Sequence, residues 1–182
     1  MLIAVGQPAP EFILKDQDQN DVKLSDYRGK NVVIVFYPLD WSPVCTDEHA
    51  CFAGNLAQFE KLNAQVIGLS VDSTWSHKAF AEKMGVGYPL LADFHPRGVV
   101  ADKFGVYHAD KGITGRAIVI IDKAGNVAWV TRNTDFRLTA STSSQSCSVI
   151  SPMGCGRAIP ALFTNTVTGP SCRSTCRAIS PT

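Results

Sequence analysis

The chain has 182 residues, of which 45% are hydrophobic and 18% are charged, and its formal net charge is +1. This length predicts one domain, and the composition is ordinary for a globular protein. The near-neutral charge gives no reason to expect a nucleic-acid partner or an anionic membrane surface, and no stretch is apolar over the length that a membrane span needs.

The first six residues lack a basic region followed by an apolar run, so we expect no signal peptide and a cytoplasmic location. Cysteines in that compartment rest mostly reduced. A disulfide framework of the kind found in small secreted domains is therefore the less favoured reading of the six cysteines. Two of them lie in the patterned part of the chain and four in its last quarter: Cys45, Cys51, Cys147, Cys155, Cys172 and Cys176.

The first half of the chain alternates short apolar runs with turn-forming residues. Residues 12–14 and 22–24 predict the two arms of a small hairpin. Residues 32–37 predict a buried strand that ends at Pro38, and residues 66–71 predict a second one. Between these strands, apolar residues three or four apart predict one long helix over residues 43–62.

The second half continues the same alternation. Ser73 is a candidate N-cap for a helix that ends at Gly85, and its predicted buried face comprises Trp75, Ala79, Phe80 and Met84. Further predicted elements are a short apolar run at 89–92, a helical pattern at 97–104, and two strands at 117–122 and 127–131 joined as a hairpin.

This order of elements predicts an α/β fold with a central sheet of mixed strand direction flanked by helices, which is the thioredoxin-like plan. Cys45 then lies just past the carboxyl end of a central strand. Ligands gather at that edge of open α/β sheets.

The composition changes abruptly after Arg132. Residues 134–182 contain no Lys, no Glu and a single Asp, and no apolar periodicity persists. We therefore predict a thioredoxin-like domain over residues 1–133 and an atypical tail over 134–182. A disordered tail, a naturally variable tail and a shifted reading frame remain open, and the further amphipathic helix that the fold plan requires is not found.

The turn after the predicted strand 32–37 carries the most informative motif, Pro38-x-x-x-Ser42-x-x-Cys45. Cys45 lies in the first turn of the predicted helix, where unpaired backbone N–H groups and the positive end of the helix dipole stabilise negative charge. The thiolate is the nucleophilic form of cysteine, so this context favours a reactive thiol over an inert buried one.

The motif resembles the active-site signature of the peroxiredoxins, and the resemblance covers about residues 3–132. Gly115-Arg116 before the strand 117–122 supports it, as do residues 89–93 and 104–106. The resemblance implies that Cys45 is the peroxidatic cysteine, which attacks a peroxide oxygen and becomes a sulfenic acid. It implies no cofactor and no metal.

The resemblance also implies roles for the residues around this cysteine. Ser42, in a place usually held by Thr, would hydrogen-bond the peroxide, and Pro38 would shape the pocket and exclude water. Arg116 would hold the thiolate and the developing charge, since a guanidinium stays charged and offers several fixed donors; a plain surface charge is the alternative. Glu48 is a candidate to orient Arg116, with favourable placement in the first helical turn as the alternative.

Cys51 is the candidate resolving cysteine. Six residues along a helix correspond to about 600° of rotation, so Cys51 points away from Cys45, and a disulfide would require the helix start to unwind. In some peroxiredoxins a resolving cysteine lies in the same helix, one position nearer. The alternatives are a packed core residue beside Phe52, with an external thiol or a tail cysteine acting as resolver.

Other chemistry is not expected. The four histidines, His49, His77, His95 and His108, are scattered, and solvated side chains are expected for them. Cys172 and Cys176, with Cys147 and Cys155, make only a weak zinc pattern. No Cys-x-x-Cys and no glycine-rich phosphate loop occurs, which argues against a dithiol reductase and against a nucleotide or flavin. Trp41 and Tyr37 are expected in the pocket wall or the core.

The sequence thus predicts a thiol-dependent peroxidase that reduces hydrogen peroxide and organic hydroperoxides. The expected partners are a thiol reductant, such as thioredoxin or a similar small redox protein, and a second copy of the chain in a homodimer. The alternative is a redox-sensing or chaperone-like thioredoxin-fold module in which oxidation of Cys45 switches a partner interaction.

Overall fold

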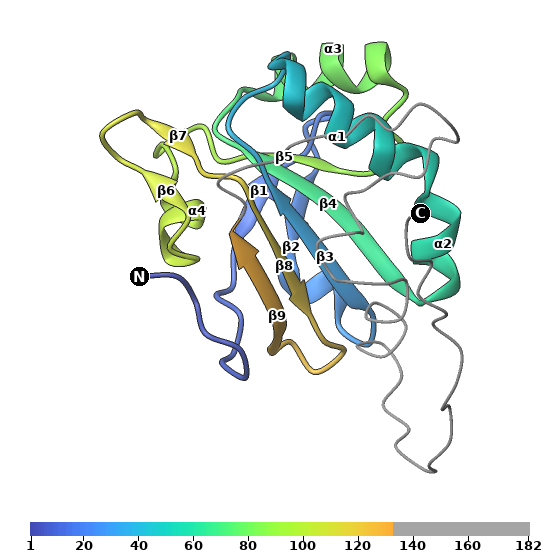
Figure 1. Cartoon of the computed structure of the whole chain (residues 1–182), viewed down its shortest axis with the longest axis vertical. Helices are drawn as coiled ribbons and strands as arrows, with labels where there is room; N and C mark the ends of the chain where they lie inside the picture. Colours follow the sequence, from blue (N-terminus) through green and yellow to red (C-terminus); the bar gives the residue numbers. More distant parts are fainter. Residues whose placement is uncertain (133–182) are drawn as a thin grey trace, which may run out of the picture.

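The computed structural model describes residues 1–132, so the predicted tail and its four cysteines lie outside the described residues. A seven-stranded sheet of order β2-β1-β5-β4-β3-β8-β9 forms the centre of this part (Figure 1). Strands β3, β4 and β5 are parallel to one another, and the remaining pairs are antiparallel. The predicted mixed sheet is therefore confirmed. Its strands are β1 Ile13–Lys15, β2 Asp21–Lys23, β3 Asn31–Phe36, β4 Ala64–Ser70, β5 Leu90–Ala92, β8 Ala117–Ile121 and β9 Val127–Arg132.

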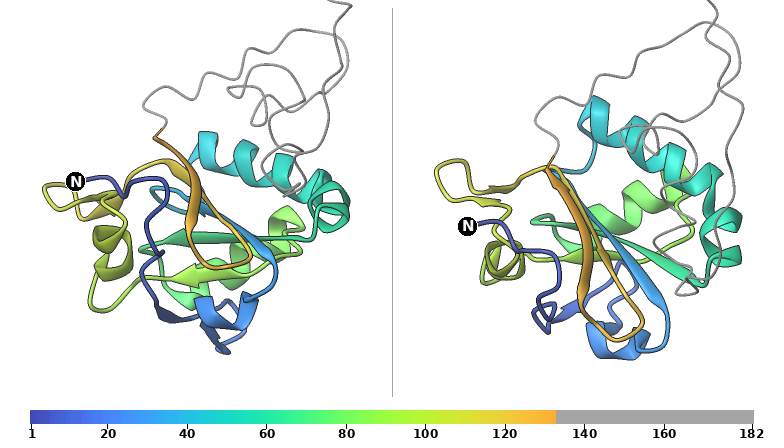
Figure 2. Two further views of the ribbon diagram at one scale, coloured as in Figure 1. Left: turned by 90° about the horizontal axis from the view of Figure 1, so that it is seen from below. Right: turned by 60° about the horizontal axis from the view of Figure 1, so that its bottom comes forward.

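Helices flank the sheet, as the views in Figures 1 and 2 show. Helices α1 Pro43–Gly54, α2 Leu56–Lys61 and α3 Thr74–Met84 pack on one face. Helix α4 Val99–Lys103 packs on the other face, next to a two-stranded sheet that the sequence did not predict. Its strands are β6 Tyr107–His108 and β7 Ile113–Thr114.

The two faces follow from the alternation of side chains along β3. Val33 and Val35 point into the α1–α3 cluster, whose other members include Phe52, Phe59 and Phe80. Ile34 and Phe36 point into the α4 cluster, whose other members include Val100, Ala101 and Phe104. All six residues of β3 are buried, because both faces of the sheet are covered.

Helix α3 begins and ends where the sequence predicts. The Ser73 hydroxyl accepts a hydrogen bond from the Ser76 backbone N–H, and Gly85 ends the helix in the left-handed conformation at φ 65°. The predicted buried face is rotated, however. Trp75 is 74% exposed and Ala79 is also exposed. The buried residues are His77, Phe80 and Ala81.

The single long helix predicted over residues 43–62 is wrong in one respect. It breaks at Asn55 (φ −113°, ψ 10°), so that α1 and α2 are separate. The Asn55 side-chain amide donates to the Cys51 carbonyl oxygen over 2.9 Å, which occupies one of the carbonyl groups that the end of α1 leaves unpaired. The sequence signal was the Gly54-Asn55 pair, since both residue types favour helix ends.

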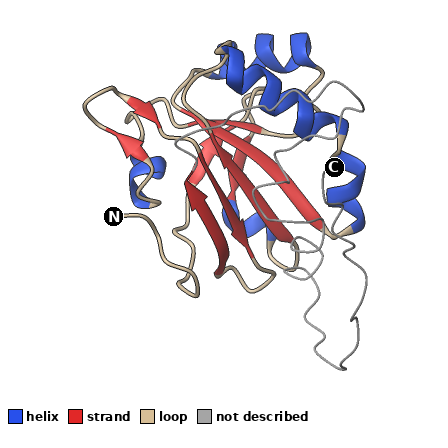
Figure 3. Cartoon of the chain, viewed as in Figure 1, coloured by secondary structure: helices blue, strands red, loops and turns tan. Residues whose placement is uncertain are grey.

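Figure 3 shows that the helices of the described part are short. The longest is α1, with 12 residues. Within residues 1–132 no helix has the length and apolar character needed to cross a membrane.

Candidate active site

The turn from Tyr37 to Ser42 connects β3 to α1 and carries the predicted motif. Ser42 is the N-cap of α1, with extended backbone angles, and Pro43 is its first residue. Proline suits that position because it has no N–H to leave unpaired. Cys45 is the third residue of the helix, so its backbone N–H has no acceptor within the helix. The positive end of α1 therefore lies beside this thiol.

Arg116 reaches the same place from a distant part of the chain. Strand β8 is antiparallel to β3 and pairs Ala117 with Phe36, so the residue before β8 lies where β3 ends. Gly115 fits there because a Cβ atom would lie only 2.7 Å from His108 Nε2 and 2.9 Å from the Val106 carbonyl oxygen. Arg116 Nη2 donates to Cys45 Sγ over 3.1 Å.

Cys45 is a free cysteine with 0% exposed surface. Its sulfur is nevertheless not enclosed by hydrocarbon alone, because the guanidinium of Arg116 contacts it directly. The helix N-terminus and this cation both stabilise negative charge on Sγ. Cys45 Sγ thus lies between two groups of positive character.

Glu48 lies one turn further along α1 and is 0% exposed. Its Oε2 atom is 3.3 Å from Arg116 Nε, which makes an ion pair, although the angle falls outside that of a hydrogen bond. Burial raises the pKa of Glu48 to about 7, and the charge and hydrogen-bonding capacity of Arg116 offset part of that rise. Glu48 therefore changes its charge near neutral pH.

Ser42 and Pro38 belong to the turn between β3 and α1. The Ser42 carbonyl oxygen accepts hydrogen bonds from the backbone N–H and the hydroxyl of Thr46, over 2.9 and 3.0 Å. The Ser42 hydroxyl is buried and has no hydrogen-bond partner among the described residues. It does not cap the helix, so it is available to a bound molecule. Pro38 is half-buried at the start of the turn.

Cys51 lies on the same helix as Cys45 but on another side. It is half-buried and packs against the α1–α3 cluster, of which its neighbour Phe52 is a member. Cys45 and Cys51 are not bonded to each other, since Cys45 is free. The resolving role of Cys51 stays a prediction.

Two histidines that the sequence placed in solvent are buried, and that expectation is wrong. His49 and His77 are both 0% exposed. His49 Nδ1 lies 2.7 Å from the Tyr88 hydroxyl, and burial lowers the pKa of His49 to about 4. The signal was the spacing of Cys45, Glu48, His49 and Phe52, all buried at positions i, i+3, i+4 and i+7 of one helix face.

The aromatic residues of the turn differ from each other. Tyr37 is fully buried, as expected for a core residue. Trp41 is 51% exposed and packs edge-on against Phe80, with ring centroids 5.3 Å apart. Across the part of the chain that the structure describes, no group of three or more His, Cys, Asp or Glu residues is placed to hold a metal ion.

Comparison with known proteins assigns the chain to a family. The model of the AhpC/TSA family matches residues 5–130. The chain belongs to this family. It is a peroxiredoxin, a thiol-dependent peroxidase and hence an oxidoreductase, as the sequence predicts. Enzymes of this family act on a peroxide and are reduced by a thiol.

The chain is similar to several named relatives. It is 40% identical over 136 residues to peroxiredoxin Q, chloroplastic, of Gentiana triflora, covering 72% of this chain and 60% of that protein. It is 38% identical over 129 residues to alkyl hydroperoxide reductase E of Mycobacterium tuberculosis, covering 70% and 84%. It is 42% identical over 139 residues to peroxiredoxin-2 of Bos taurus, covering 71% and 69%.

Solved structures confirm the thioredoxin-like fold. Peroxidoxin BcpB of Mycobacterium tuberculosis superposes with a TM-score of 0.67 at 31% identity, over 71% of this chain and 86% of that one. The reduced 2-Cys peroxiredoxin of Plasmodium vivax superposes with a TM-score of 0.66 at 30% identity, over 72% and 86%.

Proposed function

We propose that Cys45 is the peroxidatic cysteine of this peroxidase and that Ser42, Pro38, Arg116 and Glu48 form its site. The observation that carries the proposal is the 3.1 Å contact between Arg116 Nη2 and Cys45 Sγ at the N-terminus of α1. A guanidinium 71 positions away in sequence meets the sulfur that the helix end already favours as a thiolate.

The first step follows from this geometry. The Cys45 thiolate attacks the terminal oxygen of ROOH, the O–O bond breaks, and the sulfur becomes S–OH while RO⁻ leaves. RO⁻ takes up a proton and departs as ROH. The fixed donors beside the sulfur, Arg116 and the Ser42 hydroxyl, stabilise the charge that moves onto the leaving oxygen. Pro38 shapes the start of the turn and excludes water from the reacting sulfur.

The sulfenic acid is then reduced by thiols. A first thiol attacks Cys45–SOH and releases water, leaving a mixed disulfide, and a second thiol attacks that disulfide and restores Cys45–SH. In one version of the proposal Cys51, in its reduced form, supplies the first thiol after the start of α1 unwinds. In the other version an external thiol does so. Thioredoxin or a similar small redox protein is the proposed reductant in both, and a cytoplasmic homodimer is the proposed setting.

Stopped-flow mixing with hydrogen peroxide tests the proposal. Trp41 lies four residues from Cys45, so its fluorescence is a suitable signal for oxidation of the thiol. We expect rapid oxidation in the unmodified chain and none in Cys45→Ser. Oxidation at the rate of an ordinary thiol would instead favour the redox-sensing module. Mass spectrometry after one equivalent of peroxide distinguishes a Cys45–Cys51 disulfide from a trapped sulfenic acid, and gel filtration reports the oligomer.

A further inference from the structure

The turn between β3 and α1 holds a backbone conformation that its own sequence does not favour. Trp41 has φ 63°, in the left-handed region that residues with a side chain seldom adopt. Such a conformation persists only where the surroundings fix it. The residue before Trp41 is Asp40, and it carries most of the contacts that hold this turn.

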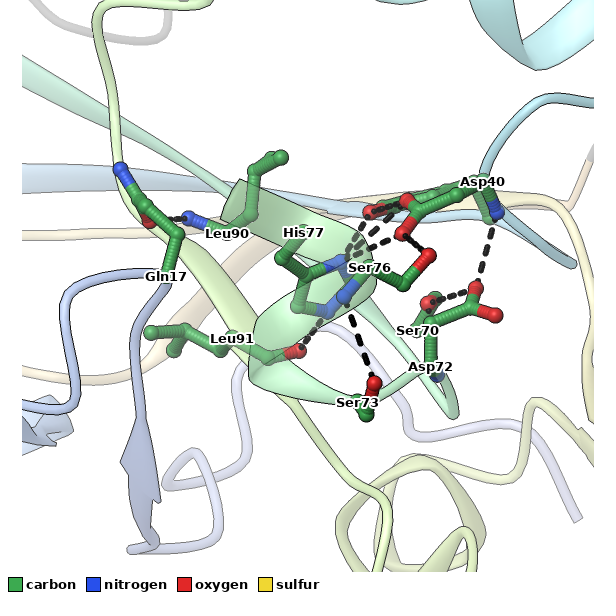
Figure 4. Close-up of polar contacts among 10 residues, drawn as sticks. Gln17, Asp40, Ser70, Asp72, Ser73, Ser76, His77, Leu90 and Leu91 are labelled. Carbon is green, nitrogen blue, oxygen red and sulfur yellow. Dashed lines mark hydrogen bonds and ion pairs between the residues drawn. The ribbon is translucent and has the colours of Figure 1, made fainter. Parts of the chain in front are cut away.

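Asp40 is buried, with 6% of its surface exposed, and is bonded through both its backbone and its side chain. Its backbone N–H donates to Asp72 Oδ2 over 2.8 Å. Its carboxylate accepts hydrogen bonds from the Tyr37 hydroxyl over 2.9 Å and from the Ser76 hydroxyl over 2.6 Å, and His77 Nδ1 lies 3.0 Å from Oδ2. Figure 4 shows these contacts converging on Asp40 from α3 and from the loop after β4.

Both ring nitrogens of His77 have partners. Its Nε2 atom lies 3.2 Å from the Leu91 carbonyl oxygen, which can only accept, so Nε2 carries a hydrogen. Its Nδ1 atom faces the Asp40 carboxylate and also lies 3.3 Å from the Tyr37 hydroxyl. Burial raises the pKa of Asp40, but the hydrogen bonds and charge of His77, together with the Ser76 and Tyr37 bonds, outweigh it and lower that pKa. Asp40 and His77 thus face each other as a pair in which both side chains are 0% exposed.

A buried carboxylate and its partner seldom increase stability by themselves, since apolar side chains of the same volume stabilise a fold as much or more. This pair also takes no part in peroxide chemistry, because neither member contacts Cys45, Ser42 or Arg116 among the described contacts. What the pair does is tie α3 to the turn that ends in Ser42. We propose that Asp40 and His77 are positioning residues that hold this turn, and so place the Ser42 hydroxyl and the start of α1 for reaction with peroxide.

The proposal rests on the proposed function and predicts a split between two reactions of Cys45. Peroxide cleavage needs the placed donors, whereas alkylation by iodoacetamide needs only an accessible thiolate. In Asp40→Asn and His77→Gln we expect the rate of peroxide oxidation to fall roughly tenfold to a hundredfold. The rate of Cys45 alkylation, followed by peptide mass spectrometry, should hold steady or rise.

Asp93→Asn is the matched control. Asp93 is also a buried carboxylate, but it accepts a hydrogen bond from the Ala101 backbone N–H and makes no contact with the turn. We expect it to lower thermal stability while leaving the ratio of the two rates unchanged. If Asp93→Asn shifts this ratio as much as Asp40→Asn does, Asp40 and His77 have only a structural role.

Milder variants keep the test decisive if Asp40→Asn does not fold. Tyr37→Phe and Ser76→Ala each remove one hydrogen bond to Asp40 without changing the charge, and we expect about a fivefold loss of peroxide rate in each. Unchanged rates in both would overturn the inference. A slow reaction in the unmodified chain would overturn the proposed function instead, so the two failures are distinguishable.

Discussion

The two faces of the central sheet bury polar groups in different ways. On the α4 side the buried carboxylate Asp93 bonds to the backbone of Ala101 and so serves the fold. On the α1–α3 side the buried polar residues Asp40, Glu48 and His77 bond to or pair with other side chains, close to the turn and the helix that carry Cys45. We therefore expect the α4 face to serve stability alone and the α1–α3 face to serve both stability and reactivity.

The largest effect should come from the α4 cluster and should concern stability alone. Phe104 is 0% exposed, and its ring centroid lies 5.2 Å from that of Phe36. Phe104→Ala should lower the free energy of unfolding by about 3–5 kcal/mol, through lost burial and the cavity left behind. Urea unfolding measures this loss, and the peroxide rate of the folded fraction should not change.

Phe80→Ala is the matching variant on the α1–α3 face of the sheet. Phe80 is equally buried but packs against Trp41 and His49, with centroids 5.3 and 5.5 Å away. This variant should lose both stability and peroxide rate. If Phe104→Ala and Phe80→Ala change the peroxide rate equally, the two faces do not differ in their effect on reactivity.

Arg116→Lys should give the next largest effect. A planar guanidinium contacts Cys45 with Nη2 and Glu48 with Nε at once, and an ammonium group cannot make both contacts. We expect the second-order rate constant for hydrogen peroxide to fall roughly 10²-fold. Stopped-flow fluorescence measures it, and a circular dichroism spectrum like that of the unmodified chain excludes misfolding. A loss below about threefold would show that charge alone suffices.

Ser42 offers a smaller and more specific test. Its buried hydroxyl has no partner among residues 1–132, so removing it leaves no other group unpaired there. Ser42→Ala should slow oxidation by peroxide about tenfold, and Ser42→Thr, which keeps the hydroxyl, should retain the rate. The same stopped-flow assay compares the two. Equal loss in both variants would indicate a packing effect.

Glu48→Gln should give the smallest effect, and one that depends on pH. The pKa of Glu48 is raised to about 7, so the side chain is neutral below that pH, like Gln, and charged above it. We divide the peroxide rate of the unmodified chain by that of the variant. This ratio should approach one at pH 6 and rise about threefold by pH 8, because the ionised carboxylate orients Arg116. A ratio independent of pH would mean that Glu48 does not titrate in this range.

The same shift makes a prediction about stability. The folded state keeps the Glu48 proton up to about pH 7, whereas the unfolded state releases it near the ordinary value of 4.5. The contribution of Glu48 to the free energy of unfolding therefore falls as pH rises between these two values, and stays low above them. Urea unfolding at pH 5 and pH 8 should show a smaller decline in Glu48→Gln.

The elements that could be predicted from the sequence are those in which one periodicity of apolar side chains dominates. The apolar runs of β3 and β4 and the capped helix α3 were predictable, because both faces of the sheet are covered and Ser73 and Gly85 are strong end signals. The contact between Cys45 and Arg116 was predicted only through the resemblance to the peroxiredoxins. No local pattern joins these residues; the antiparallel pairing of β8 with β3 does so.

The buried histidines were missed for a physical reason. A buried helix face is recognised in a sequence by the spacing of apolar side chains. The buried face of α1 includes the polar residues Glu48 and His49, so this spacing does not reveal it. The partner of His77 is Asp40, 37 positions away, and that distance carries no sequence signal. The rotated face of α3 has the same origin, since Trp75 is apolar but exposed while His77 is polar but buried.

The position of Arg116 has a consequence during biosynthesis. A nascent chain that has emerged only through α1 contains the sulfur and its helix end, but the guanidinium is made 71 residues later and arrives only when β8 joins the sheet. Under the proposed function, strong reactivity of Cys45 toward peroxide therefore appears late, after the central strands have assembled. Until then Cys45 reacts under this proposal only as an ordinary thiol, so unfinished chains are less open to oxidation there.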